Sequence, residues 1–182
     1  LVLMIIARLE KLLQHKSAVV RQRVLTSYLV VLKKFVPKIA QEKVPQKEPC
    51  FPEIGKHLSF LLARTNDGTE ASRGLAVECV QALLYLDQLL GNPDEPKSKQ
   101  EIKLLTDVKN RISAAPPAPI PGAPVLSAVE ICQRRYPVLD DIVGVLAAVA
   151  ASGELVALMR ALVPRLTDND APAAMGAARC LS

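Results

Sequence analysis

Cysteine and histidine are the side chains in this sequence that could coordinate a metal ion, and their spacing argues against such a site. The cysteines stand at positions 50, 79, 132 and 180, and the histidines are His15 and His57. No two cysteines share the Cys-x-x-Cys spacing that is typical of zinc sites. Three of the cysteines lie in apolar helical contexts, so we interpret them as small buried residues of a protein from a reducing compartment, the cytosol or the nucleus. We expect neither a metal nor a cofactor.

Two pairs of neighbouring carboxylates, Asp140–Asp141 and Asp94–Glu95, could be taken for catalytic dyads. Adjacent residues on a helix point about 100° apart, so neither pair would converge on a substrate. Their places near expected helix N-termini offer a simpler explanation, because the helix dipole favours negative charge there. The sequence also contains no phosphate-binding glycine loop, no zinc-protease motif and no nucleophile elbow. We therefore predict that the protein is not an enzyme.

Positive charge is concentrated at the start of the chain. Residues 1–50 carry ten Lys or Arg against three Asp or Glu, whereas residues 51–182 are slightly acidic. One interpretation is an electrostatic adaptor that binds nucleic acid or an anionic membrane through basic residues 8–47. Apart from Tyr28 and Phe35, which fit an apolar helix face, this region lacks the aromatic residues that stack on bases. A solvated, lysine-rich surface is the alternative.

The composition indicates helices packed on helices. Half of the residues are hydrophobic, only 3% are aromatic, and tryptophan is absent. The 14 prolines fall mostly between periodic segments, where they act as breaks. The apolar start of the chain is too short to cross a bilayer, so we expect no transmembrane segment. Because the sequence begins and ends within apparent helices, we interpret it as part of a longer protein.

Hydrophobic periodicity places these helices in pairs. The first pair covers 1–14 and a second helix that Pro37 is expected to close, and in the next pair the turn "TNDGT" precedes a helix over 70–90. In the last pair "TDND" forms the turn and Asp170 caps the final helix. We divide the chain into four units: 1–48 with its basic following segment, 49–92, an interrupted unit 93–151 with a Pro-rich loop 114–124, and a truncated last pair 152–182.

The helix over 70–90 shows what kind of fold this is. Its side chains are apolar around most of the circumference, and the exception is one narrow polar side formed by Glu78, Gln81, Tyr85 and Gln88. Such a helix needs neighbours on three sides. The second helices of the pairs align at offsets of about 52 and 102 residues, which places the last copy roughly two periods beyond the second. Helix pairs that recur at this spacing predict an α-solenoid.

Two stretches, "AVVRQRVLTSYLVVL" and "ALVPRLTDNDAPAAMGAARCL", resemble HEAT repeats. The stretch "SFLLARTNDGTEASRGLAVECVQALLYL", together with the later "ICQRRYPVLDDIVGVL", resembles more specifically the maestro heat-like repeat family, over most of residues 50–182. The resemblance implies an all-α fold in which antiparallel helix pairs stack as a HEAT-type α-solenoid. It also implies a large protein without enzymatic activity.

The resemblance assigns a role to two arginines. In HEAT-like proteins, an arginine early in the second helix pairs with the turn aspartate of a neighbouring repeat. In this sequence Arg21 and Arg73 occupy that position, and Asp67 and Asp168 are the candidate partners. We expect an inter-repeat ladder of ion pairs, with direct binding of a ligand by these arginines as the alternative.

The expected function is that of a scaffold or adaptor that binds other proteins through the inner face of the solenoid. If Arg21 and Arg73 are equivalent, then Thr26 and Lys33 match Glu78 and Tyr85, and all four lie on the polar sides of their helices. We therefore predict a partner-binding surface made of Thr26, Lys33, Glu78, Gln81, Tyr85 and Gln88. A purely architectural spacer in a larger protein is the third alternative.

Overall fold

The computed structural model describes residues 2–42, 54–90, 99–113, 126–150 and 152–182. Helices account for nearly all of them, and these residues contain no β-strand, which confirms the all-α class. The helices are α1 Val2–Leu12, α2 Ala18–Glu42, α3 Ile54–Arg64, α4 Glu70–Leu90, α5 Lys99–Ser113, α6 Ala128–Gln133, α7 Tyr136–Val149, α8 Ser152–Leu162, the 3₁₀ helix η1 Val163–Thr167, and α9 Ala171–Leu181. The predicted loop 114–124, the pair Asp94–Glu95 and Cys50 lie outside the described residues.

Helix α2 differs from its predicted extent, because it continues through Pro37 to Glu42 instead of ending there. Proline removes the hydrogen bond to the carbonyl four residues earlier, which here belongs to Lys33. The Lys33 side chain is exposed, so water can reach this part of the helix. Water near Lys33 can replace the donor that the proline lacks.

The segment 125–151, expected as part of one interrupted unit, contains two helices. Helix α6 begins with a capping box, in which the Ser127 side chain accepts from the Glu130 amide and the Glu130 carboxylate accepts from the Ser127 amide. It lasts less than two turns, and α7 begins directly afterwards with Pro137 in its first turn. Proline is well tolerated there because the first-turn amides lack helical partners.

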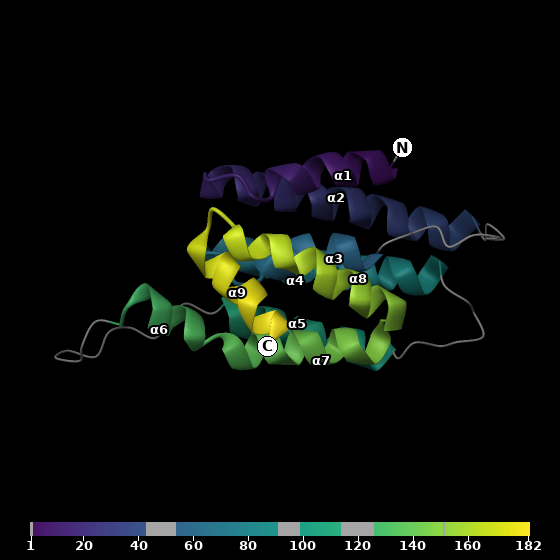
Figure 1. Cartoon of the computed structure of the whole chain (residues 1–182). Coiled ribbons are helices and arrows are strands. Elements are labelled where there is room, and N and C mark those ends of the chain that lie inside the picture. Colours follow the sequence, from purple (N-terminus) through teal and green to yellow (C-terminus); the bar gives the residue numbers. More distant parts are fainter. Residues whose placement is uncertain (1, 43–53, 91–98, 114–125, 151) are drawn as a thin grey trace.

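The helices form layers (Figure 1). Helices α2, α4 and α5 lie side by side, α3 packs against α4, and α8 packs against the other side of α3. This placement of α8 and α9 differs from the expected one, in which the unit before them would separate them from α3. The turn before α4 and the turn before α9 instead lie in direct contact, with Gly68 N donating to Asp170 Oδ2 at 3.1 Å.

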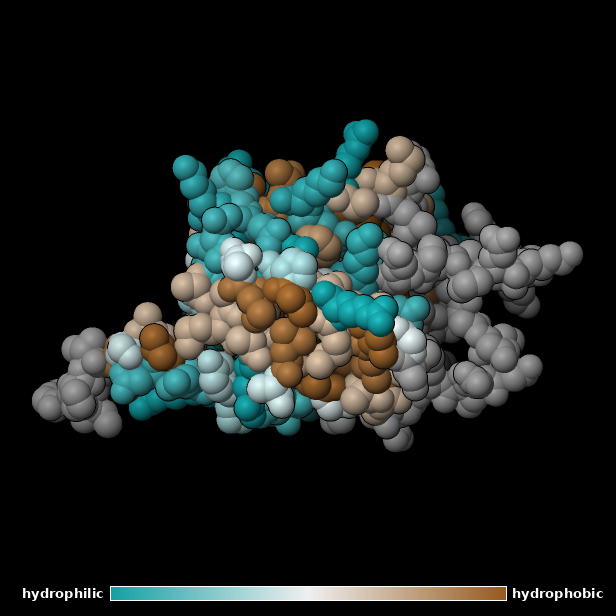
Figure 2. Space-filling model, in the orientation of Figure 1, coloured by the Kyte–Doolittle hydropathy of each residue, from teal (hydrophilic) through white to brown (hydrophobic). Residues whose placement is uncertain are grey.

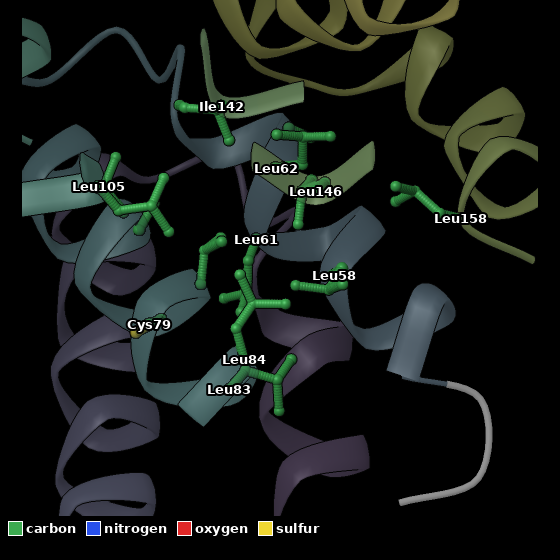
Figure 3. Close-up of a cluster of buried hydrophobic side chains, with 14 of the residues drawn as sticks. Leu58, Leu61, Leu62, Cys79, Leu83, Leu84, Leu105, Ile142, Leu146 and Leu158 are labelled. Carbon is green, nitrogen blue, oxygen red and sulfur yellow. The ribbon is translucent and has the colours of Figure 1, made fainter. Parts of the chain in front are cut away.

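A leucine-rich core joins these layers (Figure 3). Its central side chains come from five helices and include Leu58, Leu61, Leu62, Cys79, Leu83, Leu84, Leu105, Ile142, Leu146 and Leu158. Tyr28, which was predicted to fit an apolar helix face, is fully buried in the same cluster. Removal of this apolar surface from water is the main force that holds the layers together.

Among the described residues, no helix combines the length and the apolar character needed to cross a membrane.

Candidate functional site

Three helix-connecting turns meet at one end of the molecule, and five charged side chains from them and from the adjoining helices form what we call the turn cluster. Its members are Arg21, Arg64, Asp67, Asp168 and Asp170. The cluster is buried: the side chains of Arg64 and Asp67 are at most 1% exposed. The sequence places one aspartate-containing turn before α4 and another before α9. Arg21 and Arg64 each pair with aspartates of both turns.

Arg21 connects all three turns. Its Nε donates to Asp67 Oδ2 at 2.7 Å, and its Nη2 donates to Asp67 Oδ1 at 3.1 Å and to Asp170 Oδ1 at 2.9 Å. Its Nη1 donates to the carbonyl oxygens of His15 and Lys16, both at 3.0 Å. Each guanidinium nitrogen therefore has an acceptor, which is the condition under which a buried arginine is stable.

Arg64 was not singled out from the sequence, and Asp170 was expected only as a helix cap. Arg64 Nη1 donates to Asp67 Oδ2 at 3.0 Å, and Arg64 Nη2 forms an ion pair with Asp168. Asp168 was assigned to the ladder, yet its partner is Arg64 and not Arg21 or Arg73. The available signal was the position of Arg64, three residues before Asp67 and directly before the turn "TNDGT".

The pKa shifts in the turn cluster reflect burial and pairing. Burial favours the neutral form of Asp67, but hydrogen bonds from Arg21 and Thr69 outweigh that effect and lower the pKa of its carboxyl. Burial and the nearby charge of Asp67 raise the pKa of Asp170. Burial alone would lower the pKa of Arg21, but its pairing with Asp67 raises it. The cluster thus holds Asp67 firmly ionised.

Arg73 does not join an aspartate carboxylate, in contrast to its expected role in the ladder. Its Nε donates to the carbonyl of Ile112 at 2.9 Å, and its Nη1 donates to the carbonyl of Asp67 at 3.1 Å. The Asp67 carboxylate already accepts from Arg21, Arg64 and Thr69, so its oxygens are occupied. Arg73 therefore fastens the end of α5 to the turn before α4 through backbone acceptors.

A second polar region runs across α2, α4 and α5. Glu78, on α4, accepts from Lys33 of α2 at 3.1 Å and forms an ion pair with Lys109 of α5. Gln81 donates to Thr106 Oγ1, again on α5, at 3.2 Å. We call this region, made of Thr26, Lys33, Glu78, Gln81, Tyr85, Thr106 and Lys109, the polar stripe. Its α5 members were not predicted, because periodicity within one helix does not reveal which helix lies beside it.

The remaining side chains of the predicted partner-binding surface have different environments. Thr26 is exposed, and its hydroxyl donates to the carbonyl of Gln22 at 3.0 Å. Tyr85 was expected to be exposed but is half-buried and packs against the hydrophobic core. The side chain of Gln88 lies outside what the structure describes. Burial would raise the pKa of Glu78, but hydrogen bonds from Lys109 and Lys33 hold it below its ordinary value.

A buried triad links α1, α2 and α3. His57 Nδ1 lies 2.6 Å from Glu10 Oε1, and the hydroxyl of Tyr28 donates to the same oxygen at 3.2 Å. Burial, followed by the charge of Glu10, raises the pKa of Tyr28 well above its ordinary value. The sequence pattern does not indicate this contact, because His57 and Glu10 are 47 positions apart.

The adjacent carboxylates Asp140 and Asp141 point to different partners. Asp140 Oδ2 accepts from Arg179 at 2.6 Å, and Asp141 Oδ2 accepts from Arg111 at 2.6 Å. The thiols of Cys79, Cys132 and Cys180 are buried, and burial raises the pKa of Cys180 to about 12. Within the described residues, no three His, Cys, Asp or Glu side chains are grouped to hold a metal ion. The two carboxylates therefore join α7 to α9 and to α5.

Comparison with known proteins gives two matches. The family model described as "Maestro, HEAT repeats" matches residues 19–182. A maestro heat-like repeat-containing protein family member 1 from Dictyostelium discoideum is 32% identical over 113 residues, which is 60% of this chain. The aligned region spans only 7% of that relative's length. No solved structure matches.

Proposed function

This chain belongs to the maestro HEAT-repeat family, and we propose that it is a scaffold whose polar stripe binds other proteins. The family match confirms the predicted HEAT-type α-solenoid. Stacked helix pairs present long surfaces to partners, and HEAT repeats generally mediate protein interactions. The proposed role includes no catalysis. We also propose a reducing compartment, the cytosol or the nucleus, because the described cysteines are buried thiols.

The continuity of the polar stripe across three helices is the observation that supports this proposal. Lys33, Glu78 and Lys109 are connected from α2 over α4 to α5. These side chains are partly or largely open to solvent, since Lys33 is 64% and Lys109 is 36% exposed. Tyr85 lies on the same side of α4 and, being half-buried, offers a fixed aromatic edge. Tyrosine is enriched in protein-binding surfaces and among the residues that contribute most to binding.

The basic surface of α1 and α2 supports a second candidate, binding to nucleic acid or to an anionic membrane. Seven cationic side chains on this surface are exposed: Arg8, Lys11, Lys16, Arg23, Lys33, Lys34 and Lys38. Of the two carboxylates in these helices, Glu10 is 97% buried and pairs with His57, and the Glu42 side chain lies outside what the structure describes. The exposed side of the first helix pair is therefore strongly positive.

A matched pair of variants tests the scaffold role. Glu78→Ala removes the centre of the polar stripe, and Glu70→Ala removes an exposed carboxylate from the first turn of the same helix. With the chain as bait in affinity purification, we expect Glu78→Ala to lose proteins that the wild type and Glu70→Ala both retain. Equal retention by all three baits would contradict the assignment of the polar stripe.

Salt separates the two candidates. Electrostatic binding to nucleic acid or lipid weakens steeply between about 0.05 and 0.2 M salt, whereas a partly apolar protein interface changes little. We expect the Glu78-dependent partners to persist over that range. If the bound material is nucleic acid or lipid and is lost as the salt rises, the first helix pair is the binding region.

A further inference from the structure

The outer side of α8 and η1 carries apolar residues where it faces solvent. We call these residues the apolar seam: Val156, Met159, Val163 and Leu166, which are 50%, 42%, 55% and 42% exposed. They follow one another at steps of three, four and three residues, the spacing of a seam between two packed helices. A 3₁₀ helix has three residues per turn, so Val163 and Leu166 lie on the same side of η1. Figure 2 shows apolar side chains gathered in the middle of this face, over α8 and α9.

A groove with cationic walls runs beside the apolar seam, between α3 and α8. Its volume is about 360 Å³, its charged lining residues are Lys56, Arg160 and Arg165, and no carboxylate lines it. Phe60 and Pro164 contribute apolar surface. Arg160 follows Met159 and Pro164 follows Val163, so the groove lies about 100° around the helix from the seam. Apolar and positive surfaces therefore run in parallel along α8.

Arg165 has hydrogen-bonding capacity that the described residues leave unused. Its guanidinium lies over the ring of Phe60, 3.9 Å from the centroid. Its Nε and Nη1 atoms are buried, and neither has a hydrogen-bond partner among the described residues. Because these two atoms are buried, a docked carboxylate would compensate the positive charge of Arg165 from the groove and would not bond to them.

We propose that the apolar seam and the adjoining groove form a docking surface for an acidic amphipathic helix of a partner protein. The apolar side of that helix covers Val156, Met159 and Val163. Its carboxylates face Arg160 and Arg165 across the groove. Charge complementarity favours this occupant over a basic peptide, and the seam spacing favours a helix over an extended strand.

This surface is separate from the polar stripe. Helix α3 lies between α8 and α4, so a partner on α8 leaves the polar stripe on α2, α4 and α5 uncovered. One scaffold could therefore hold two proteins on different sides. A variant in one surface should leave binding at the other unchanged, so the two proposals can fail independently.

Three labelled synthetic peptides test the proposal by fluorescence anisotropy with the whole chain. The first is an amphipathic helix of leucine and glutamate, the second has the same composition in scrambled order, and the third has lysine in place of glutamate. We expect the first peptide alone to bind. Binding that is absent, or equal for all three peptides, would overturn the proposal.

Matched variants then locate the site. Arg160→Glu and Met159→Ser should each weaken binding of the acidic peptide by roughly tenfold. Their controls, Arg23→Glu and Met4→Ser, change exposed residues of the same types on α2 and α1 and should alter binding by less than about twofold. Equal losses in variants and controls would overturn the assignment to α8. Circular dichroism of each variant verifies that it is folded.

Two further measurements examine other occupants. If sedimentation shows a dimer that Met159→Ser dissociates, a second copy of this chain covers the seam and the proposal is wrong. It is equally wrong if phosphatidylserine vesicles bind in an Arg160-dependent manner and the acidic peptide fails to displace them. A monomer whose vesicle binding does not depend on Arg160 supports the peptide-docking assignment.

Discussion

The turn cluster and the polar stripe use the same chemistry, arginine or lysine paired with aspartate or glutamate, in opposite environments. In the turn cluster Asp67 is fully buried and accepts from three side chains. In the polar stripe Glu78 is partly exposed, and its partner Lys33 is 64% exposed. Water can replace a partner of Glu78 but cannot replace one of Asp67. We therefore assign the first region to the fold and the second to recognition.

The largest effect is expected for Asp67→Ala. The change leaves Arg21 and Arg64 buried with fewer acceptors, and loss of one partner of a buried ion pair costs about 3–5 kcal/mol. Urea denaturation would measure the free energy of unfolding. The matched control is Asp141→Ala, in which an exposed pair with Arg111 is lost and a change below about 1 kcal/mol is expected. Equal effects in the two variants would contradict the distinction between buried and exposed ion pairs.

A smaller effect is expected for Gly176→Ala, which tests how closely α9 approaches the turn before α4. A Cβ at position 176 would lie 2.6 Å from the Cβ of Asn66, so the helix or the turn must shift. The shift would strain the hydrogen bond from Asn66 Nδ2 to the Pro172 carbonyl, now 2.6 Å. Overpacking of this kind costs about 1–3 kcal/mol. The control Gly153→Ala has open space around the new methyl group and should be nearly neutral.

Acidification should reduce the difference in stability between the wild type and Asp67→Asn. The pKa of Asp67 is lower in the folded chain than in the unfolded chain, so its carboxylate stabilises the fold above the unfolded value of about 4. That contribution disappears as the pH falls through the lower, folded value. Thermal melts between about pH 2 and pH 7 should show the two curves converging at the acidic end. A difference that grows with acidity would contradict the inferred direction of the shift.

The smallest effect is expected for Glu78→Gln in the polar stripe. The variant loses the ion pairs with Lys33 and Lys109, but these side chains remain accessible to water. Surface pairs typically contribute less than about 1 kcal/mol, and salt screens them. Urea denaturation at low and high salt should show a small difference that shrinks further at high salt. A loss as large as that of Asp67→Ala would mean that the polar stripe stabilises the fold and is not free to exchange partners.

Much of the local structure could be predicted from particular residues. Period and turn chemistry identified the helices on both sides of "TNDGT" and "TDND", and Asp170 indeed accepts from the Ala173 amide as a helix cap. The wheel of α4 placed Glu78 and Gln81 on its polar side and Val80 and Leu83 in the core. The continuation of α2 through Pro37 was missed, because proline is unfavourable inside a helix and was therefore taken as its end.

The sequence by itself determined which faces of each helix are apolar, because that pattern depends only on residue type and on 3.6 residues per turn. Tertiary structure decided which helices meet. It brought the turn before α9 against the turn before α4, so that Asp170 reached Arg21 across 149 positions and Arg64 took Asp168. It also placed α5 beside α4 and so gave Glu78 the partner Lys109. Such contacts depend on how several helices bury their apolar faces together, and this choice is not encoded in the periodicity of any one of them.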